Sequence, residues 1–81
     1  MSMSVTVRFF AAARVAAGAR ELSVQASSLT ELIADLSARS TELERVMPQC
    51  SILINEVVTH DRSVELSDGD VVDFLPPFAG G

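Results

Sequence analysis

A single segment with the periodicity of an amphipathic helix lies between two sets of strand-like segments, and this arrangement strongly restricts the possible folds. Its apolar residues recur at the spacing of one helix face, at Leu29, Leu32, Ile33 and Leu36. Ser28 and Glu31 stand at the spacing of the N-cap and N3 residues of a capping box. The pattern therefore predicts a helix that begins after Ser28 and runs to about Ala38.

Strand patterns precede and follow this helix. Alternating apolar residues, rich in β-branched and aromatic types, predict strands at Val5–Phe10, Glu21–Val24, Ser51–Ile54, Val57–Thr59 and Val71–Leu75. The small residues of Ala11–Ala19 are expected to form a loop, although a short helix over Ala11–Ala17 also fits. Thr41–Glu44 repeats the spacing of a helix cap, and Gly69 supplies the positive φ of a tight turn before the last strand.

The order of these elements predicts the fold class. Two strands, one main helix and three more strands in a chain of 81 residues give an α+β domain, with a mixed sheet of about five strands and the helix across one face. A last strand that lies parallel to the first at the sheet centre makes this the β-grasp, or ubiquitin-like, arrangement. Strand alternation places five side chains in the core: Val5, Val7, Phe9, Val72 and Phe74. We expect a body of residues 1–75 and an extended tail of residues 76–81.

The tail is expected to be stiff at its start and to end in two residues without side chains. Pro76 and Pro77 hold φ at about −65° and donate no hydrogen bond to a sheet, so the tail is expected to leave the body extended. Residues 76–81 can reach roughly 20 Å at about 3.3 Å per residue. Gly80 and Gly81 have no Cβ, so a free carboxylate on Gly81 would be unhindered enough to enter another protein's active site. The alternative is a frayed terminus, which is common at chain ends.

Apolar residues are expected to converge beside the root of the tail. Phe10, Leu53 and Leu75 are expected to point away from the helix, and Phe78 follows in the tail. Exposed apolar residues that cluster mark partner sites, whereas a single one is ordinary. The predicted docking surface comprises this cluster and the rest of the tail: Phe10, Leu53, Leu75, Pro76, Pro77, Phe78, Ala79 and Gly80.

Charge and composition exclude several classes of partner. The net charge is −5, and all six basic residues are arginines without a basic stripe, which disfavours nucleic acid and anionic membranes. Without lysine the chain cannot form a Schiff base with a carbonyl substrate. Its single cysteine excludes an intrachain disulfide, and no apolar run approaches the roughly 20 residues that span a bilayer. With no signal-peptide pattern at its start, the chain is expected to be cytoplasmic.

Other candidates for chemistry are weaker. Cys50 could carry a persulfide, but it has no CxxC partner or neighbouring histidine, so a packing role is the simpler interpretation. His60 and Asp61 resemble part of a catalytic dyad only in sequence and are expected in a turn. Asp68 and Asp70 flank a glycine and read as turn residues rather than a paired acid and base. No metal-ligand cluster is evident in the sequence.

The chain resembles the MoaD/ThiS family, and within it the MoaD branch, the small sulfur-carrier subunits of molybdopterin synthase. The resemblance covers the whole chain and rests on Val7–Ala11 with Arg14, Ser28–Leu32, Asn55, Asp68–Asp70 and Pro76–Gly81. Pro-Pro followed by two residues and Gly-Gly is more particular to this branch than Gly-Gly alone. At Phe78 and Ala79, family members often carry a smaller aliphatic residue and a Ser or Thr, a difference expected to tune fit and not chemistry.

The resemblance implies a function for the tip. A MoeB-like adenylyltransferase would use ATP to adenylate Gly81, and sulfur would then displace AMP. The resulting thiocarboxylate would enter a MoaE-like large subunit and give its sulfur to cyclic pyranopterin monophosphate. The chain would thus be a cosubstrate in a heterotetramer with that subunit, with no bound cofactor, no metal and no active site of its own.

Several alternatives remain open at this point. The sulfur recipient could belong to thiazole or cysteine synthesis, the chain could be a ubiquitin-like protein modifier, or it could be a plain interaction domain with an inert tail. Arg14 is expected either to pair with an acidic group of a partner or to be an ordinary solvated arginine.

Overall fold

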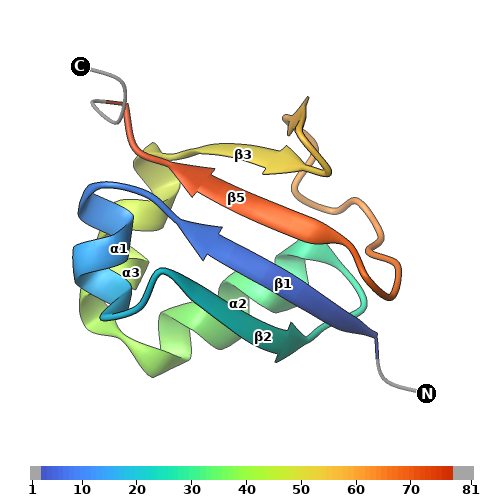
Figure 1. Cartoon of the computed structure of the whole chain (residues 1–81), viewed down its shortest axis with the longest axis horizontal. Coiled ribbons are helices and arrows are strands. Elements are labelled where there is room, and N and C mark those ends of the chain that lie inside the picture. The colour runs from blue at the N-terminus through green and yellow to red at the C-terminus, as the bar shows by residue number, and fades with distance from the viewer. Residues whose placement is uncertain (1–2, 78–81) are drawn as a thin grey trace.

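The computed structural model describes residues 3–77, so the predictions for Phe78, Ala79, Gly80 and Gly81 lie outside the described residues. The elements follow in the order β1 (Ser4–Phe9), α1 (Ala12–Ala17), β2 (Glu21–Gln25), α2 (Leu29–Arg39), α3 (Thr41–Val46), η1 (Met47–Gln49), β3 (Ser51–Ile54), β4 (Val57–Thr59) and β5 (Val71–Leu75). The strands form one sheet in the order β2-β1-β5-β3-β4. β1 and β5 run parallel beside each other, as Figure 1 shows, and the other neighbours are antiparallel. This is the predicted β-grasp topology.

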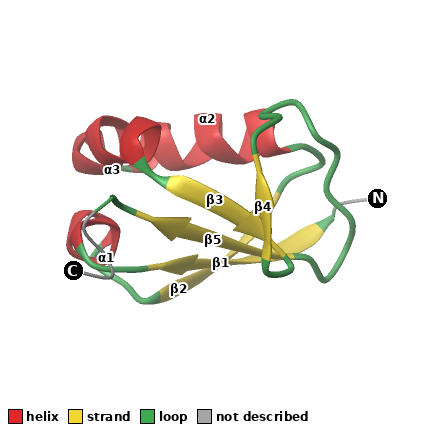
Figure 2. Cartoon of the chain, turned by 90° about the horizontal axis from the view of Figure 1, so that it is seen from above, coloured by secondary structure: helices red, strands yellow, loops and turns green. Residues whose placement is uncertain are grey.

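The helices and the sheet form two layers around one core. Figure 2 shows α2 and α3 along one face of the sheet and α1 at one end. Leu29, Leu32 and Leu36 of α2 are fully buried against that face. The rings of Phe9 and Phe74, on the two parallel strands, stack with their centroids 6.0 Å apart. All five core residues expected from strand alternation are buried, at 0–1% exposure.

The start of α2 follows the predicted capping box with one difference. The Ser28 hydroxyl accepts a hydrogen bond from the Glu31 backbone N–H at 3.1 Å. The Glu31 carboxylate accepts from the backbone N–H and the hydroxyl of Ser27, and not from the backbone of Ser28. A second side chain therefore joins the cap and fixes the turn that leads from β2 into the helix.

The two shorter helices are where the structure adds to the expectation. The stretch of small residues contains α1, which is held to the body by the fully buried Ala13 and ended by Gly18 at φ 71°. α3 begins one residue earlier than the sequence spacing indicates, because Ser40 and not Thr41 is the cap. The Ser40 hydroxyl accepts from the Leu43 N–H at 3.2 Å, which turns the Leu43 side chain into the core. No helix within residues 3–77 is long and apolar enough to cross a membrane.

Asn55 connects the β3–β4 hairpin to the start of β5. Asn55 and Glu56 form its two-residue turn with φ of 50° and 69°, a left-handed conformation that asparagine tolerates well. The Asn55 side chain donates to the Asp70 carboxylate at 2.9 Å and accepts from the Val71 N–H at 3.0 Å. A single side chain therefore ties an edge hairpin to a central strand.

Replacing Asn55 with alanine is expected to lower the free energy of unfolding by about 1–3 kcal/mol. Two side-chain hydrogen bonds are lost, and alanine tolerates the positive φ of this position less well than asparagine does. Chemical denaturation measures the change. Asn55→Gly is the matched control, since it loses the same hydrogen bonds but accepts the positive φ without strain. Stability of Asn55→Ala equal to that of the unaltered chain would show that this tie is unimportant.

Candidate functional site

Phe10, Leu53 and Leu75 lie on the sheet face opposite α2. Phe10 and Leu75 directly follow Phe9 and Phe74, the last residues that pair between β1 and β5, and strand alternation turns both away from the core. Leu53 lies on β3, diagonal to Leu75, because Ser51 is the residue that pairs with Leu75. All three side chains are half-buried. We call Phe10, Leu53 and Leu75 the tail-root patch; the structure brings them to one face, and their docking role stays a prediction.

Sequence reasoning missed that Val58 extends this face to the sheet edge. Val58 pairs with Leu53 and is 54% exposed. The signal was present, because a two-residue turn at Asn55 and Glu56 fixes which residues of the two strands face each other. Other strongly exposed apolar side chains lie away from the patch, at Met3, Val15 and Val57.

The two prolines at the root of the tail differ in exposure. Pro76 directly follows β5 and is buried, whereas Pro77 is exposed. Pro76 therefore offers little surface for a partner, and the division into a body of residues 1–75 and a tail of residues 76–81 stays a prediction. Arg14 is exposed on α1 and forms no ion pair within the described residues 3–77, which leaves both interpretations of it open.

An ion pair between Arg8 and Asp73 occupies the middle of the open sheet face and was not predicted. The two residues pair directly in the parallel register of β1 and β5. Arg8 Nε donates to Asp73 Oδ1 at 2.6 Å and Arg8 Nη2 donates to Asp73 Oδ2 at 2.7 Å. The hydrogen bonds and the charge of Asp73 raise the pKa of Arg8 above its ordinary value. Asp73 is buried, at 4% exposure, so the Arg8 guanidinium is the exposed part of the pair beside the tail-root patch.

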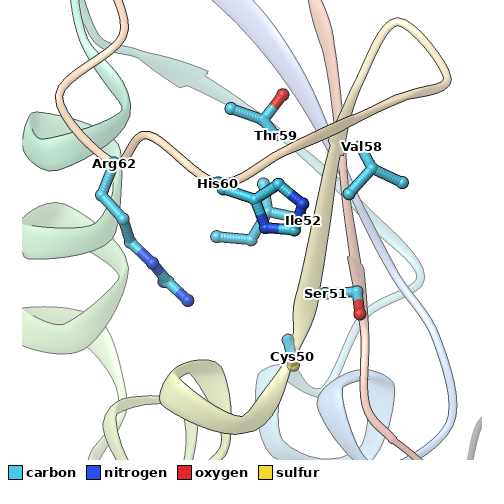
Figure 3. Close-up of a pocket in the computed structure, with 7 residues that line it drawn as sticks. All are labelled: Cys50, Ser51, Ile52, Val58, Thr59, His60 and Arg62. Atoms are coloured by element: carbon cyan, nitrogen blue, oxygen red, sulfur yellow. The ribbon is translucent and has the colours of Figure 1, made fainter.

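A small cavity of about 150 Å³ lies between β3, β4 and the loop that follows β4 (Figure 3). Its lining residues are Cys50, Ser51, Ile52, Val58, Thr59, His60 and Arg62. The Cys50 thiol is 3.5 Å from the Val46 carbonyl oxygen, to which it donates. Burial raises the pKa of Cys50, and the nearby Arg62 charge offsets only part of this effect. The thiol is therefore protonated at neutral pH, which argues against a persulfide carrier.

Cys50 is expected to react with iodoacetamide at pH 7 more slowly than an exposed cysteine in a peptide. The reason is that its raised pKa lowers the thiolate fraction and its burial limits access. Intact mass against time measures the rate, with the urea-unfolded chain as the control. Reaction as fast as that of the unfolded chain would contradict this assignment.

The acidic residues near the turns have structural partners. Asp61 accepts from the N–H and the hydroxyl of Ser63, and these bonds lower the pKa of Asp61. The Asp68 carboxylate accepts a hydrogen bond from the Ser4 N–H at 2.9 Å, and the Asp70 carboxylate accepts one from the Ser67 N–H at 2.8 Å. These geometries agree with the turn interpretation. Within residues 3–77 there is no cluster of potential ligands that could hold a metal ion.

Comparisons with known proteins agree with this arrangement. A model of the ThiS family matches residues 7–81. The molybdopterin synthase sulfur carrier subunit of Chlamydomonas reinhardtii is 31% identical over 83 residues, covering 98% of this chain and 100% of that protein.

Two solved structures extend the likeness to the fold. One is a chain of the complex of subunits 1 and 2 of molybdopterin-converting factor from Helicobacter pylori, with a TM-score of 0.76, 30% identity and coverage of 98% of this chain and 100% of that one. The other is small archaeal modifier protein 1 from Methanosarcina acetivorans, with a TM-score of 0.84, 28% identity and coverage of 100% and 99%. The family match across nearly the whole length and the full-length relative together show that this chain belongs to the MoaD/ThiS family of sulfur carriers.

Proposed function

We propose that this protein is the sulfur carrier of molybdenum cofactor biosynthesis and the small subunit of molybdopterin synthase. The observation that carries the proposal is the 31% identity, over the whole chain, with the sulfur carrier subunit from Chlamydomonas reinhardtii. The β-grasp body and its tail-root patch support it, because the patch lies where the chain leaves the sheet toward Gly81. The working atom is then the terminal acyl carbon of Gly81.

The chemistry at Gly81 begins with an unreactive carboxylate. An activating MoeB-like adenylyltransferase joins the Gly81 carboxylate to the AMP part of ATP and releases pyrophosphate. A sulfur nucleophile then attacks the acyl carbon and expels AMP, which leaves a thiocarboxylate on Gly81. The absence of a Cβ from Gly80 and Gly81 keeps the path of attack open.

Partner proteins supply the binding sites for ATP and for the pterin substrate. The sequence has no lysine and no glycine-rich loop of the kind that cradles nucleotide phosphates. A chain of the complex from Helicobacter pylori is 30% identical to this one, which supports a second subunit as its partner. A MoaE-like large subunit would cover the tail-root patch and receive the tail, as a heterotetramer, and sulfur transfer to cyclic pyranopterin monophosphate would then form molybdopterin in two rounds.

A protein modifier is the second candidate, because the small archaeal modifier protein 1 from Methanosarcina acetivorans shares the fold at 28% identity. In that case activated Gly81 would be attacked by a lysine amine of a target protein and not by sulfur. Tryptic digests of cells expressing the tagged chain separate the two functions. A remnant of residues 63–81 joined through Gly81 to lysines of other proteins would favour the modifier, because the last site that trypsin cuts in this chain is Arg62.

Intact mass spectrometry tests the proposed function. The purified chain is incubated with the adenylyltransferase of its own organism, ATP and a sulfur donor. Its mass is expected to rise by about 16 Da, the difference between sulfur and oxygen. Reactions without ATP and without the sulfur donor are the controls. An unchanged mass in the complete reaction would overturn the proposal.

A further inference from the structure

The Arg8–Asp73 pair stands where a protein partner would cover the open sheet face. Arg8 and Asp73 form the row of side chains next to Phe10 and Leu75, and Leu53 pairs with Asp73 in the same row. The pair is therefore continuous with the tail-root patch. A partner that covers the patch also covers Arg8, whose side chain is 38% exposed.

The geometry holds Arg8 in one orientation. Two parallel N–H···O bonds of 2.6 and 2.7 Å join the side chains, a bidentate arrangement that fixes the plane of the guanidinium group. The Asp73 side chain is only 6% exposed and is covered by this contact. Arginine has further N–H donors, and within residues 3–77 these donate to no protein atom. A partner that covers this face would displace the water that hydrogen-bonds to these N–H donors.

The surroundings of Arg8 determine which acceptor suits those free donors. Glu21 pairs directly with Arg8 across β1 and β2. On the other side, Arg8, Asn55, Glu56 and Val71 line an open hollow of about 280 Å³. Carboxylates thus flank Arg8 on both sides, in addition to Asp73. A further carboxylate from a partner would be repelled, whereas a neutral carbonyl oxygen would be accepted.

We propose that the Arg8–Asp73 pair is a specificity determinant of the docking face, which selects a protein partner that presents a backbone or amide carbonyl oxygen to the free N–H edge of Arg8. This inference rests on the proposed function, in which the large subunit covers the face. A partner that is purely apolar at this point leaves the remaining N–H donors of Arg8 without water and without an acceptor, and is disfavoured for that reason.

The double variant Arg8→Met with Asp73→Val tests the inference. It keeps the net charge of −5 and replaces the pair with apolar side chains, a change that is often neutral or stabilising for folding. Affinity for the purified large subunit of molybdopterin synthase from the same organism is measured by calorimetry. We expect a loss of about 10- to 100-fold, because hydrogen bonds to a charged group disappear from the interface. Thermal unfolding of the free variant is expected to show an unchanged or higher midpoint.

The opposite result distinguishes a merely structural pair. If the pair only joins β1 to β5, the double variant enlarges the apolar patch and binds as tightly as the unaltered chain or more tightly, which overturns the inference. Arg8→Lys is the matched variant, since it retains the charge but loses the planar fork, and we expect an intermediate affinity. If the unaltered chain does not bind the large subunit at all, the proposed function fails and this inference with it. Tight binding of both the unaltered chain and the double variant overturns only this inference.

Discussion

A chain that lacks Gly81 is expected to keep its fold and to lose at least about 100-fold of its rate of sulfur loading. The deletion moves the terminal carboxylate back by one residue, about 3.3–3.6 Å, and misplacement of a reacting group by even about 1 Å can cost 100-fold in rate. The fold is expected to survive because the sheet ends at Leu75 and the apolar core of the described residues 3–77 runs from Val5 to Phe74. Intact mass after reaction with the adenylyltransferase, ATP and a sulfur donor measures the loss.

Gly81→Ala is the matched control for this deletion. It retains the length of the tail and adds only a Cβ beside the reacting carbon, so an intermediate rate is expected. Thermal unfolding of both variants checks that the body is unaffected. Loading of the deleted chain at the rate of the unaltered chain would show that the position of the terminal carboxylate is not what the activating enzyme recognises.

Replacing Phe74 with alanine is expected to lower the free energy of unfolding by about 3–5 kcal/mol, because its fully buried ring leaves a cavity. Phe74 lies on the strand next to Phe9, and its ring stacks on that of Phe9. A chain of 81 residues has a total stability of roughly 4–12 kcal/mol, so this change consumes a large share of it. Urea denaturation followed by circular dichroism measures the difference.

Phe10→Ala is the control for the same chemical change on the other face of the sheet. Phe10 is half-buried, so its loss of stability is expected to be about 1–2 kcal/mol. Its effect is expected on docking instead, as at least a tenfold loss of affinity for the large subunit. Equal destabilisation by Phe10→Ala and Phe74→Ala would contradict the assignment of the two faces.

The fold follows from local signals in the sequence to a large extent. β3, β4 and β5 have the predicted bounds, because a two-residue turn at Asn55 and Glu56 and the turn at Gly69 leave little freedom of register. The sequence indicates α1 only as an alternative to a loop, because alanines carry no apolar periodicity, and within the helix only Ala13 is buried. The cap of α3 was misplaced by one residue, since Ser40 and Thr41 are both good caps and packing of Leu43 decides between them.

The candidate site was predictable only where strand alternation determines it. Alternation placed Phe10, Leu53 and Leu75 on the open face without knowledge of their neighbours. The Arg8–Asp73 pair depends on the register between the first and last strands, which are far apart in the sequence. Long-range register is set by packing of the whole sheet, so no local pattern could reveal that pair.

Sulfur transfer from the thiocarboxylated chain to different acceptors identifies the reaction that the chain serves. The loaded chain is mixed with the MoaE-like large subunit and cyclic pyranopterin monophosphate, and separately with a thiazole synthase and a cysteine synthase. If this protein is the small subunit of molybdopterin synthase, its mass falls by about 16 Da only in the first mixture, with formation of molybdopterin. A thiocarboxylate that persists with the large subunit and its pterin, but is consumed by one of the other synthases, would show that this protein is not the sulfur carrier of molybdenum cofactor biosynthesis.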